Sequence, residues 1–247
     1  MANPKIRADQ LLVEQGLAES RERAKRLVMA GLAYIHDGDK QLALDKPGRL
    51  LSPSTILGLK EPERFVSRGA YKLLTAIEHF NLDVRGLVCL DVGASTGGFT
   101  DCLLQHGAAK VYAVDVGQGQ LHEKLRPDPR VIALEGVNFR LAKPDLLPEK
   151  VDLAVIDVSF ISLTKVLHVV KGFLKTGAKV LALVKPQFEL GPNRTVKGVV
   201  RDEAAQMEAV AAVSRHAVED LGHMVHGCVA SKLKGPKGNQ EYMLLLS

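Results

Sequence analysis

Tryptophan is absent from this chain of 247 residues, and aromatic residues make up only 4% of it. Proteins that hold nucleic acid by base stacking need several aromatic side chains, so stacking cannot be the main binding device here. Any contact with nucleic acid would depend on charge instead. The net charge of +5 has the sign expected of a protein that meets phosphate groups, a sign shared by many proteins that bind no nucleic acid.

Cysteine is scarce, and metal-binding patterns are missing. The three cysteines have no C-x-x-C spacing, so we interpret them as thiols, and the eight scattered histidines lack the spacing of a metal site. No stretch approaches the roughly 20 apolar residues that cross a bilayer, and the first residues lack the hydrophobic core of a secretory signal. We therefore expect a soluble, cytoplasmic protein with no membrane partner and no metal, and the oligomeric state is left open.

The first 61 residues differ in pattern from the rest. Apolar spacing predicts a helix over residues 8–15 and a second over residues 20–30, with Ser20 as the N-cap of the second. Short strands are expected after them. Proline and mixed charge between residues 50 and 66 indicate a connector, which we place at residues 62–66, between domains of residues 1–61 and 67–247.

The second predicted helix carries one glutamate against four cations, largely opposite its apolar side: Arg21, Arg23, Lys25 and Arg26. Such a stripe would contact a nucleic-acid backbone, with each phosphate adding salt-sensitive affinity that is mostly blind to sequence. A solvated helix face is the alternative. The segment from Arg7 to Gly31 resembles the S4 RNA-binding module, although the usual ending of that module is only partly kept. The resemblance implies that Arg7, Ser20 and the four cations contact RNA.

Strands and helices alternate from residue 67 onward, as in a mostly parallel α/β sheet. After an amphipathic helix that reaches about residue 80, we expect a long helix over residues 203–221 and seven strands: residues 88–92, 111–116, 131–134, 153–157, 179–184, 223–230 and 242–246. Seven strands with a late hairpin fit the class I, Rossmann-like methyltransferase sheet.

A glycine-rich turn follows the first of these strands, in the run Asp91-Val-Gly-Ala-Ser-Thr-Gly-Gly-Phe99. Its spacing is neither the dinucleotide fingerprint nor a phosphate loop. We expect the glycines to let a ligand approach the main chain. Asp115 ends the next strand, 24 residues beyond Asp91, close to the offset at which a carboxylate accepts ribose hydroxyls.

This combination suits S-adenosyl-L-methionine, and a generic strand-turn-helix with a surface aspartate is the alternative. Asn138 is a weaker candidate beside the adenine, unless it only caps a turn. The predicted cofactor-binding residues are Asp91, Gly93, Ala94, Ser95, Thr96, Gly97, Gly98, Phe99, Asp115, Val116 and Asn138.

Four ionisable residues stand out by their positions: Lys72, Asp157, Lys185 and Glu241. Asp157 and Lys185 each follow an apolar run, and neighbouring parallel strands would bring these two ends side by side. A lysine that is partly desolvated near a second cation has its ammonium form disfavoured, so it can serve as a base toward a ribose 2′-hydroxyl. The alternative is two surface ion pairs, Lys72 with Glu241 and Lys185 with Asp157.

The segment of residues 63–246 resembles the FtsJ-like 2′-O-methyltransferases. The motifs that carry the resemblance are Val66-Ser-Arg-Gly-Ala-Tyr-Lys-Leu73, the glycine-rich run, Asp157-Val-Ser-Phe-Ile-Ser162, Val184-Lys-Pro-Gln-Phe188 and Gly235-Pro-Lys-Gly-Asn-Gln-Glu241. The resemblance implies a catalytic tetrad of Lys72, Asp157, Lys185 and Glu241, with Lys185 nearest the attacking oxygen, and Arg68 as a further RNA contact.

Joined to the S4 module, the chain resembles the hemolysin A or TlyA-type family. The resemblance implies methylation of a cytidine 2′-hydroxyl in ribosomal RNA, with ribosomal RNA or a ribosomal subunit as the partner. An RNA-binding or ribosome-assembly protein without catalysis and a membrane-active hemolysin are the alternatives. Three lysines before Glu241 would extend the basic surface toward RNA or form a solvated loop: Lys232, Lys234 and Lys237.

Overall fold

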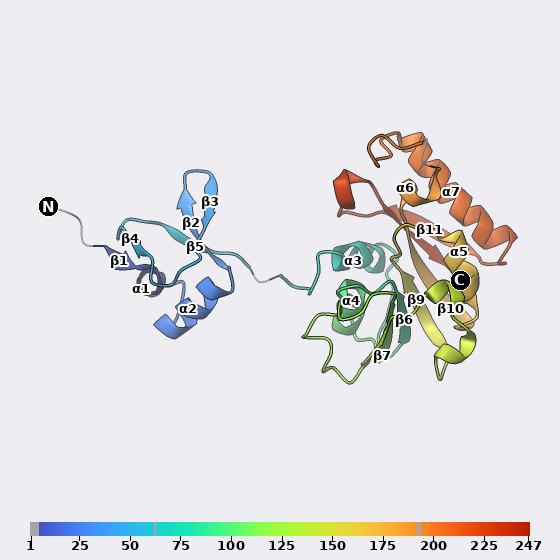
Figure 1. Cartoon of the computed structure of the whole chain (residues 1–247), viewed down its shortest axis with the longest axis horizontal. Coiled ribbons are helices and arrows are strands. Elements are labelled where there is room, and N and C mark those ends of the chain that lie inside the picture. Colours follow the sequence, from blue (N-terminus) through green and yellow to red (C-terminus); the bar gives the residue numbers. More distant parts are fainter. Residues whose placement is uncertain (1–4, 62, 192–193) are drawn as a thin grey trace. The chain divides into compact units, whose positions relative to one another are not determined.

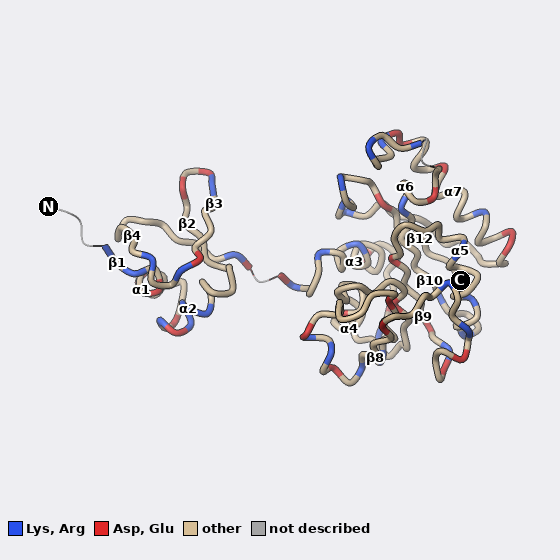
Figure 2. The backbone as a smooth tube through the Cα atoms, in the orientation of Figure 1, with Lys and Arg blue, Asp and Glu red and all other residues tan. Residues whose placement is uncertain are grey.

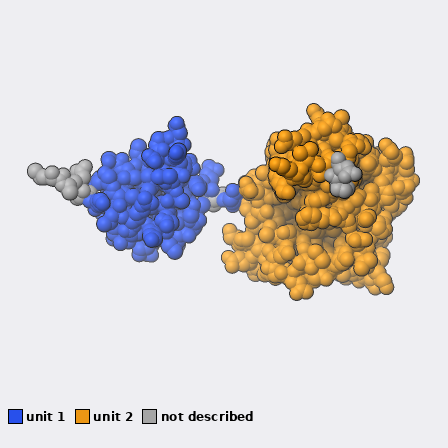
Figure 3. Space-filling model, turned by 45° about the horizontal axis from the view of Figure 1, so that its top comes forward, with its two compact units in different colours: residues 1–64 blue, residues 65–247 orange. Residues whose placement is uncertain are grey.

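The computed structural model describes residues 5–61, 63–191 and 194–247 (Figure 1). The chain divides into two compact units, residues 1–64 and residues 65–247, which Figure 3 colours separately. The division falls within the connector predicted at residues 62–66, of which Pro62 lies outside the described residues.

The N-terminal unit packs two short helices against short strands. The predicted helices are confirmed as α1 (Ala8–Glu14) and α2 (Arg21–Met29), and the Ser20 hydroxyl caps α2 by accepting the Arg23 backbone N–H at 3.2 Å. The strands form two antiparallel groups, β1 (Ile6–Arg7) with β4 (Leu50–Leu51), and β2 (Ala33–Asp37) between β3 (Lys40–Ala43) and β5 (Leu57–Leu59). A core of aliphatic side chains, among them Leu12 and Val28, joins the helices to these strands.

The C-terminal unit contains a seven-stranded sheet in the order β11-β12-β10-β9-β6-β7-β8. The strands are β6 (Val88–Val92), β7 (Lys110–Asp115), β8 (Val131–Glu135), β9 (Val151–Ile156), β10 (Leu174–Val184), β11 (Val225–Ala230) and β12 (Tyr242–Leu246). All neighbours from β10 to β8 pair in parallel, and β12 lies antiparallel between β10 and β11. All seven predicted strands are confirmed, and so is the α/β fold class.

Helices cover both faces of this sheet. The core on one face contains side chains of α3 (Ala70–His79) and α4 (Gly98–Gln105), and the core on the other contains side chains of α5 (Thr164–Lys171) and α7 (Glu203–Glu219). Leu90 packs into one core while Cys89 packs into the other. Because both faces are covered, the central strands read as continuous apolar runs.

The cysteines remain thiols, as predicted, and no disulfide joins any of the three. Burial raises the pKa of the Cys89 thiol to about 12 and that of Cys228 to about 11, so neither is a ready nucleophile. In the described part of the chain, no helix has the length and apolar character needed to cross a bilayer.

Candidate active site

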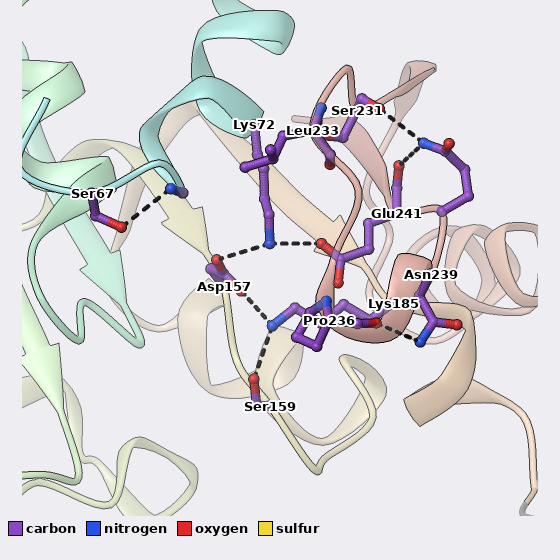
Figure 4. A network of polar contacts seen from close by, with 12 residues as sticks. Ser67, Lys72, Asp157, Ser159, Lys185, Ser231, Leu233, Pro236, Asn239 and Glu241 are labelled. Atoms are coloured by element: carbon purple, nitrogen blue, oxygen red, sulfur yellow. Dashed lines mark hydrogen bonds and ion pairs between the residues drawn. The ribbon is translucent and has the colours of Figure 1, made fainter. Parts of the chain in front are cut away.

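The four predicted tetrad residues lie together beside the carboxyl ends of the central strands (Figure 4). Lys185 Nζ lies 2.5 Å from Asp157 Oδ1 and 2.9 Å from Ser159 Oγ. Lys72 Nζ lies 2.7 Å from Glu241 Oε2 and 4.0 Å from Asp157 Oδ2. The two lysines therefore share the carboxylate of Asp157.

The sheet explains why these residues meet. Asp157 directly follows β9, and Lys185 follows the neighbouring parallel strand β10 and precedes the short helix α6 (Pro186–Glu189). Glu241 precedes β12, which runs antiparallel to β10, so that Tyr242 pairs with Val184. Lys72 comes from the first turn of α3. One edge of the sheet thus gathers residues that lie far apart in the sequence.

Burial distinguishes this cluster from ordinary surface ion pairs. The exposed fraction of the side chain is 0% for Glu241, 7% for Lys185, 10% for Lys72 and 21% for Asp157. The two pairings considered as surface pairs do form, but they are buried, and Lys72 also approaches Asp157. Because buried charges are costly to desolvate, such a cluster is weak support for stability, which leaves function as the better reason for it.

A cavity of about 550 Å³ opens beside this cluster. Asp157 lines it, together with five of the predicted cofactor-binding residues: Gly93, Ser95, Asp115, Val116 and Asn138. The carboxylate that pairs with Lys185 therefore also faces a space large enough for a nucleoside-sized ligand.

Asp115 joins the glycine-rich turn to the end of β7. Its Oδ2 accepts the Ser95 N–H at 2.8 Å, and its Oδ1 accepts the Gly117 N–H at 2.7 Å. A carboxylate has about four acceptor sites, so both oxygens can accept further donors from a ligand.

Gly93 brings the glycine-rich turn against the end of β9. Its φ is +85°, and a Cβ at this position would lie 2.4 Å from the Asp157 carbonyl oxygen. The Asp157 N–H donates to the Val92 carbonyl at 2.9 Å. The missing side chain therefore lets the cofactor turn and Asp157 lie in direct contact.

The other predicted cofactor residues lie outside the lining of the cavity: Asp91, Ala94, Thr96, Gly97, Gly98 and Phe99. Two of the three glycines of the turn pack closely against other parts of the protein. A Cβ on Gly97 would lie 2.3 Å from Leu125 Cδ1, and one on Gly98 would lie 3.1 Å from the Ala70 nitrogen. These glycines leave room for protein atoms rather than for a ligand.

Asp91 is fully buried behind the turn. Its Oδ2 accepts the Thr100 hydroxyl at 2.6 Å, which ties β6 to α4, and its Oδ1 has no hydrogen-bond partner in the described residues. Burial raises the pKa of this carboxyl to about 7. Asp91 therefore supports the turn from behind and does not reach the cavity.

Sequence reasoning assigned no role to three residues around the tetrad: Ser159, Phe160 and Glu189. Phe160 also lines the cavity and is 90% exposed, with a φ of +63° and its ring centroid 5.1 Å from that of Phe188. Glu189 accepts the Ser162 hydroxyl at 2.6 Å and the Leu163 N–H at 2.9 Å, and burial raises its pKa. It therefore fixes the loop after β9 to α6. The only signal in the sequence was that these residues lie in or beside the motifs at residues 157–162 and 184–188.

The predicted RNA-binding residues of the N-terminal unit are not all available. Arg7 and Arg21 both bind the buried Asp9, at 2.8 and 3.5 Å, and the Arg7 hydrogen bond lowers the pKa of that carboxyl. Lys25 pairs with Glu22 at 2.8 Å. The basic stripe predicted on α2 is thus narrower than expected, because half of its cations have a partner. Figure 2 marks the Lys and Arg positions of the unit in blue and its Asp and Glu positions in red.

Arg23 and Arg26 are exposed, and their side chains form no ion pair with another described residue. In the C-terminal unit, Arg68 is likewise exposed. Ser20 uses its hydroxyl to cap α2. In the described parts of the chain, no group of His, Cys, Asp and Glu side chains is placed to hold a metal ion.

The sheet, the glycine turn and the lysine-carboxylate cluster at one edge define a class I methyltransferase. A family model described as FtsJ-like methyltransferase matches residues 65–247, and the chain belongs to this family, as predicted. The resemblance of the first 61 residues to the S4 module stays a prediction.

Curated relatives span nearly the whole chain. A Mycobacterium tuberculosis protein named 16S/23S rRNA (cytidine-2′-O)-methyltransferase TlyA is 47% identical over 245 residues, which cover 98% of this chain and 90% of the relative. Hemolysin A of Brachyspira hyodysenteriae is 34% identical over 241 residues, which cover 96% of this chain and 98% of the relative. A solved structure from Streptococcus thermophilus, provisionally named a hemolysin, is 46% identical with a TM-score of 0.74, over 99% of this chain and 89% of that one.

Proposed function

We propose that this protein transfers a methyl group from S-adenosylmethionine to the ribose 2′-hydroxyl of a cytidine in ribosomal RNA. The observation that carries the proposal is the double role of Asp157, which pairs with Lys185 and lines the cavity of about 550 Å³. The Mycobacterium tuberculosis relative and a Campylobacter jejuni relative are both named cytidine-2′-O-methyltransferases acting on ribosomal RNA, which supports this choice of substrate.

The residues that line the cavity fit S-adenosylmethionine. Asp115 has acceptor sites left for ribose hydroxyls, and Val116 and Val137 offer an apolar surface to an adenine ring. The Asn138 amide is available to the edge of the base. S-adenosylmethionine supplies a methyl group on a positively charged sulfur, which makes that methyl electrophilic. A phosphate-bearing cofactor would instead meet the carboxylates of Asp115 and Asp157.

The tetrad provides the chemistry at the ribose. Lys185, in its free amine form, would take the proton of the 2′-hydroxyl at Nζ, while Asp157 and Ser159 hold that nitrogen in place. Lys72 neutralises the buried Glu241 through their contact at 2.7 Å. A positioned base contributes about 10²–10⁴-fold to such a step, and the alignment of oxygen, methyl and sulfur contributes further.

Phe160 is suited to hold the base of the target nucleotide. Its ring is exposed beside the cavity, and its backbone adopts a left-handed conformation that is unfavourable for a bulky side chain. An aromatic face in this position would stack against an unpaired base. The low aromatic content thus excludes an extended stacking platform, but it leaves this ring at the mouth of the site.

The test is to incubate purified protein with S-adenosylmethionine labelled in its methyl group and with ribosomal subunits, and then to hydrolyse the RNA in alkali. A 2′-O-methyl group blocks alkaline cleavage, so the label should appear in an alkali-resistant dinucleotide whose 5′ residue is cytidine. Label on a base would contradict the proposal. RNA binding without incorporation would favour the assembly protein, and leakage of liposomes without incorporation would favour the hemolysin.

A further inference from the structure

Two Lys-Gly turns lie beside the tetrad. Lys197 and Gly198 form the tip of a tight turn in which Val196 and Val199 exchange backbone hydrogen bonds of 2.9 and 3.0 Å. Lys237 and Gly238 lie in the 3₁₀ turn η4 (Pro236–Gly238). Both lysines adopt left-handed backbone angles, with φ of +52° and +58°, and each following glycine does so too. The turns therefore have the same unusual backbone conformation.

Lysine is unfavourable at a turn position with left-handed backbone angles. Asparagine and glycine adopt left-handed angles more readily, and they are preferred in tight turns with two left-handed residues. A lysine in this conformation costs free energy. We therefore attribute its presence to a role of the charged side chain rather than to the geometry of the turn. The same reasoning applies to both turns.

The buried side chain of Asn239 joins the two turns, and Figure 4 shows its contact with Pro236 of the second turn. Its Oδ1 accepts the Val200 N–H at 3.1 Å, and its Nδ2 donates to the Gly198 carbonyl at 2.9 Å and to the Pro236 carbonyl at 3.1 Å. A Cβ on Gly198 would lie 3.3 Å from Lys237 Nζ. The Lys237 ammonium therefore lies over the other turn.

Neither lysine is neutralised by the rest of the protein. Within the described residues, Lys197 and Lys237 take part in no ion pair, whereas Lys232 pairs with Glu78 at 3.1 Å and Arg194 pairs with Glu208 at 2.7 Å. Both Lys197 and Lys237 are exposed. The Lys237 ammonium lies over the turn that carries Lys197, and neither lysine has an ion-pair partner in the described chain, so the two turns offer positive charge to an anion from outside the protein.

The turn that carries Lys237 also lies next to the tetrad. A Cβ on Gly235 would lie 2.0 Å from Glu241 Oε1, so the turn that carries Lys237 packs directly on a tetrad residue. In an RNA chain, the carbon that bears the 2′-hydroxyl is bonded to the carbon whose oxygen carries the 3′-phosphate. A ribose whose 2′-hydroxyl is held at Lys185 therefore has a phosphodiester close to Lys185.

On the basis of the proposed function, we propose that Lys197 and Lys237 form a binding site for a phosphodiester of the substrate RNA adjoining the methylated ribose. The site supplies charge but no base-edge contact, so it positions the backbone and does not read the sequence. Asn239 positions the two turns, and Lys234 extends the same basic surface.

The experiment compares the double variant Lys197→Asn/Lys237→Asn with the wild-type chain. Asparagine removes both charges and suits the left-handed backbone, so the thermal midpoint should not fall. Binding to deproteinised ribosomal RNA is measured by filter retention at several KCl concentrations. The slope of log affinity against log[KCl] should become shallower by about 1, since the variant loses the contact to one phosphodiester.

The matched control is Lys150→Gln/Lys179→Gln, which removes two exposed charges, one just before β9 and one at the middle of β10, away from the tetrad edge. Its slope should equal that of the wild-type chain, and Lys197→Arg/Lys237→Arg should keep the wild-type slope. A wild-type slope in the asparagine variant, or an equal change in the control, would overturn the inference. Methyl incorporation by the wild-type chain is measured separately, so failure of the proposed function is distinguishable from failure of this site.

Discussion

Two carboxylates in this protein are each shared by two cations, and their surroundings differ. In the N-terminal unit, Asp9 is fully buried and binds Arg7 and Arg21. In the C-terminal unit, Asp157 binds Lys72 and Lys185 and also lines a cavity of about 550 Å³. The charge pattern is similar, but only Asp157 combines it with a ligand-sized space. A shared carboxylate is therefore a structural tie in one unit and part of a candidate active site in the other.

The largest effect on methyl transfer is expected from a change at Lys185, and no change at a cation of the N-terminal unit should lower the rate as much. Lys185→Ala should lower the rate of methyl transfer to ribosomal subunits by at least about 10²-fold, because it removes the proposed base. Binding of S-adenosylmethionine, measured by calorimetry, should change little, since Lys185 is not among the residues that line the cavity. Lys150→Ala is the control, and a wild-type rate in Lys185→Ala would remove Lys185 from the mechanism.

The exposed ring of Phe160 provides the next test. Phe160→Ala should lower kcat/KM for ribosomal subunits by about 5–150-fold, the loss expected when one base stack of about 1–3 kcal/mol is removed. The thermal midpoint should stay near the wild-type value, because the side chain is 90% exposed. Met224→Ala, at another exposed apolar side chain, is the matched control. An unchanged kcat/KM in Phe160→Ala would show that the ring does not hold the base.

Within the N-terminal unit, the unpaired cations of α2 can be compared with the arginine that binds Asp9. Arg23→Gln/Arg26→Gln should make the salt dependence of RNA binding shallower by about 2 without lowering the thermal midpoint, because neither side chain has a partner in the described chain. Arg7→Gln should instead lower the thermal midpoint, since it leaves the buried Asp9 with the weaker contact to Arg21. Equal effects of the two changes on stability would contradict this division of roles.

The last comparison concerns stability rather than activity, at Asp91, a buried carboxyl with no ion-pair partner among the described residues. Its pKa is raised from 3.8 to about 7, so the folded chain holds a proton that the unfolded chain has already lost in this range. Stability should therefore fall as the pH rises from 4 to 7, by up to about 1.4 kcal/mol per pH unit from this group. Asp91→Asn should flatten urea unfolding measured across this range, and Asp145→Asn is the exposed control. The same pH dependence in both variants would contradict the assignment.

The fold was largely predictable, because strands buried on both faces read as continuous apolar runs. The predicted ends of two strands were wrong, in one case because polar residues interrupt the strand. β10 begins at Leu174 rather than at residue 179, since the chain pairs with β9 at Leu174, then becomes irregular and resumes at Lys179. β11 begins two residues later than predicted because the His223 backbone bonds to Ala217 rather than to β12.

The site was predictable in part. Asp157 and Lys185 could be found from the sequence because the carboxyl ends of parallel strands place polar residues at one edge of a sheet. The resemblance to the FtsJ-like family was needed to join Lys72 and Glu241 to them. The packing around Gly97 and Gly98 could not be predicted from the sequence. It depends on Leu125 and on the start of α3, which are distant in the chain and lie where side chains of these glycines would be. Glu189 acts across 26 residues on Leu163, a contact with no local pattern in the sequence.

A crystal structure with bound S-adenosylmethionine tests the central claim most directly. The ligand should occupy the cavity that Gly93, Asp115 and Asp157 line, with its ribose hydroxyls on Asp115. Its methyl group should be directed toward Lys185 Nζ, leaving room for one oxygen between them. A ligand bound elsewhere, or one whose methyl group points away from Lys185, would contradict the account.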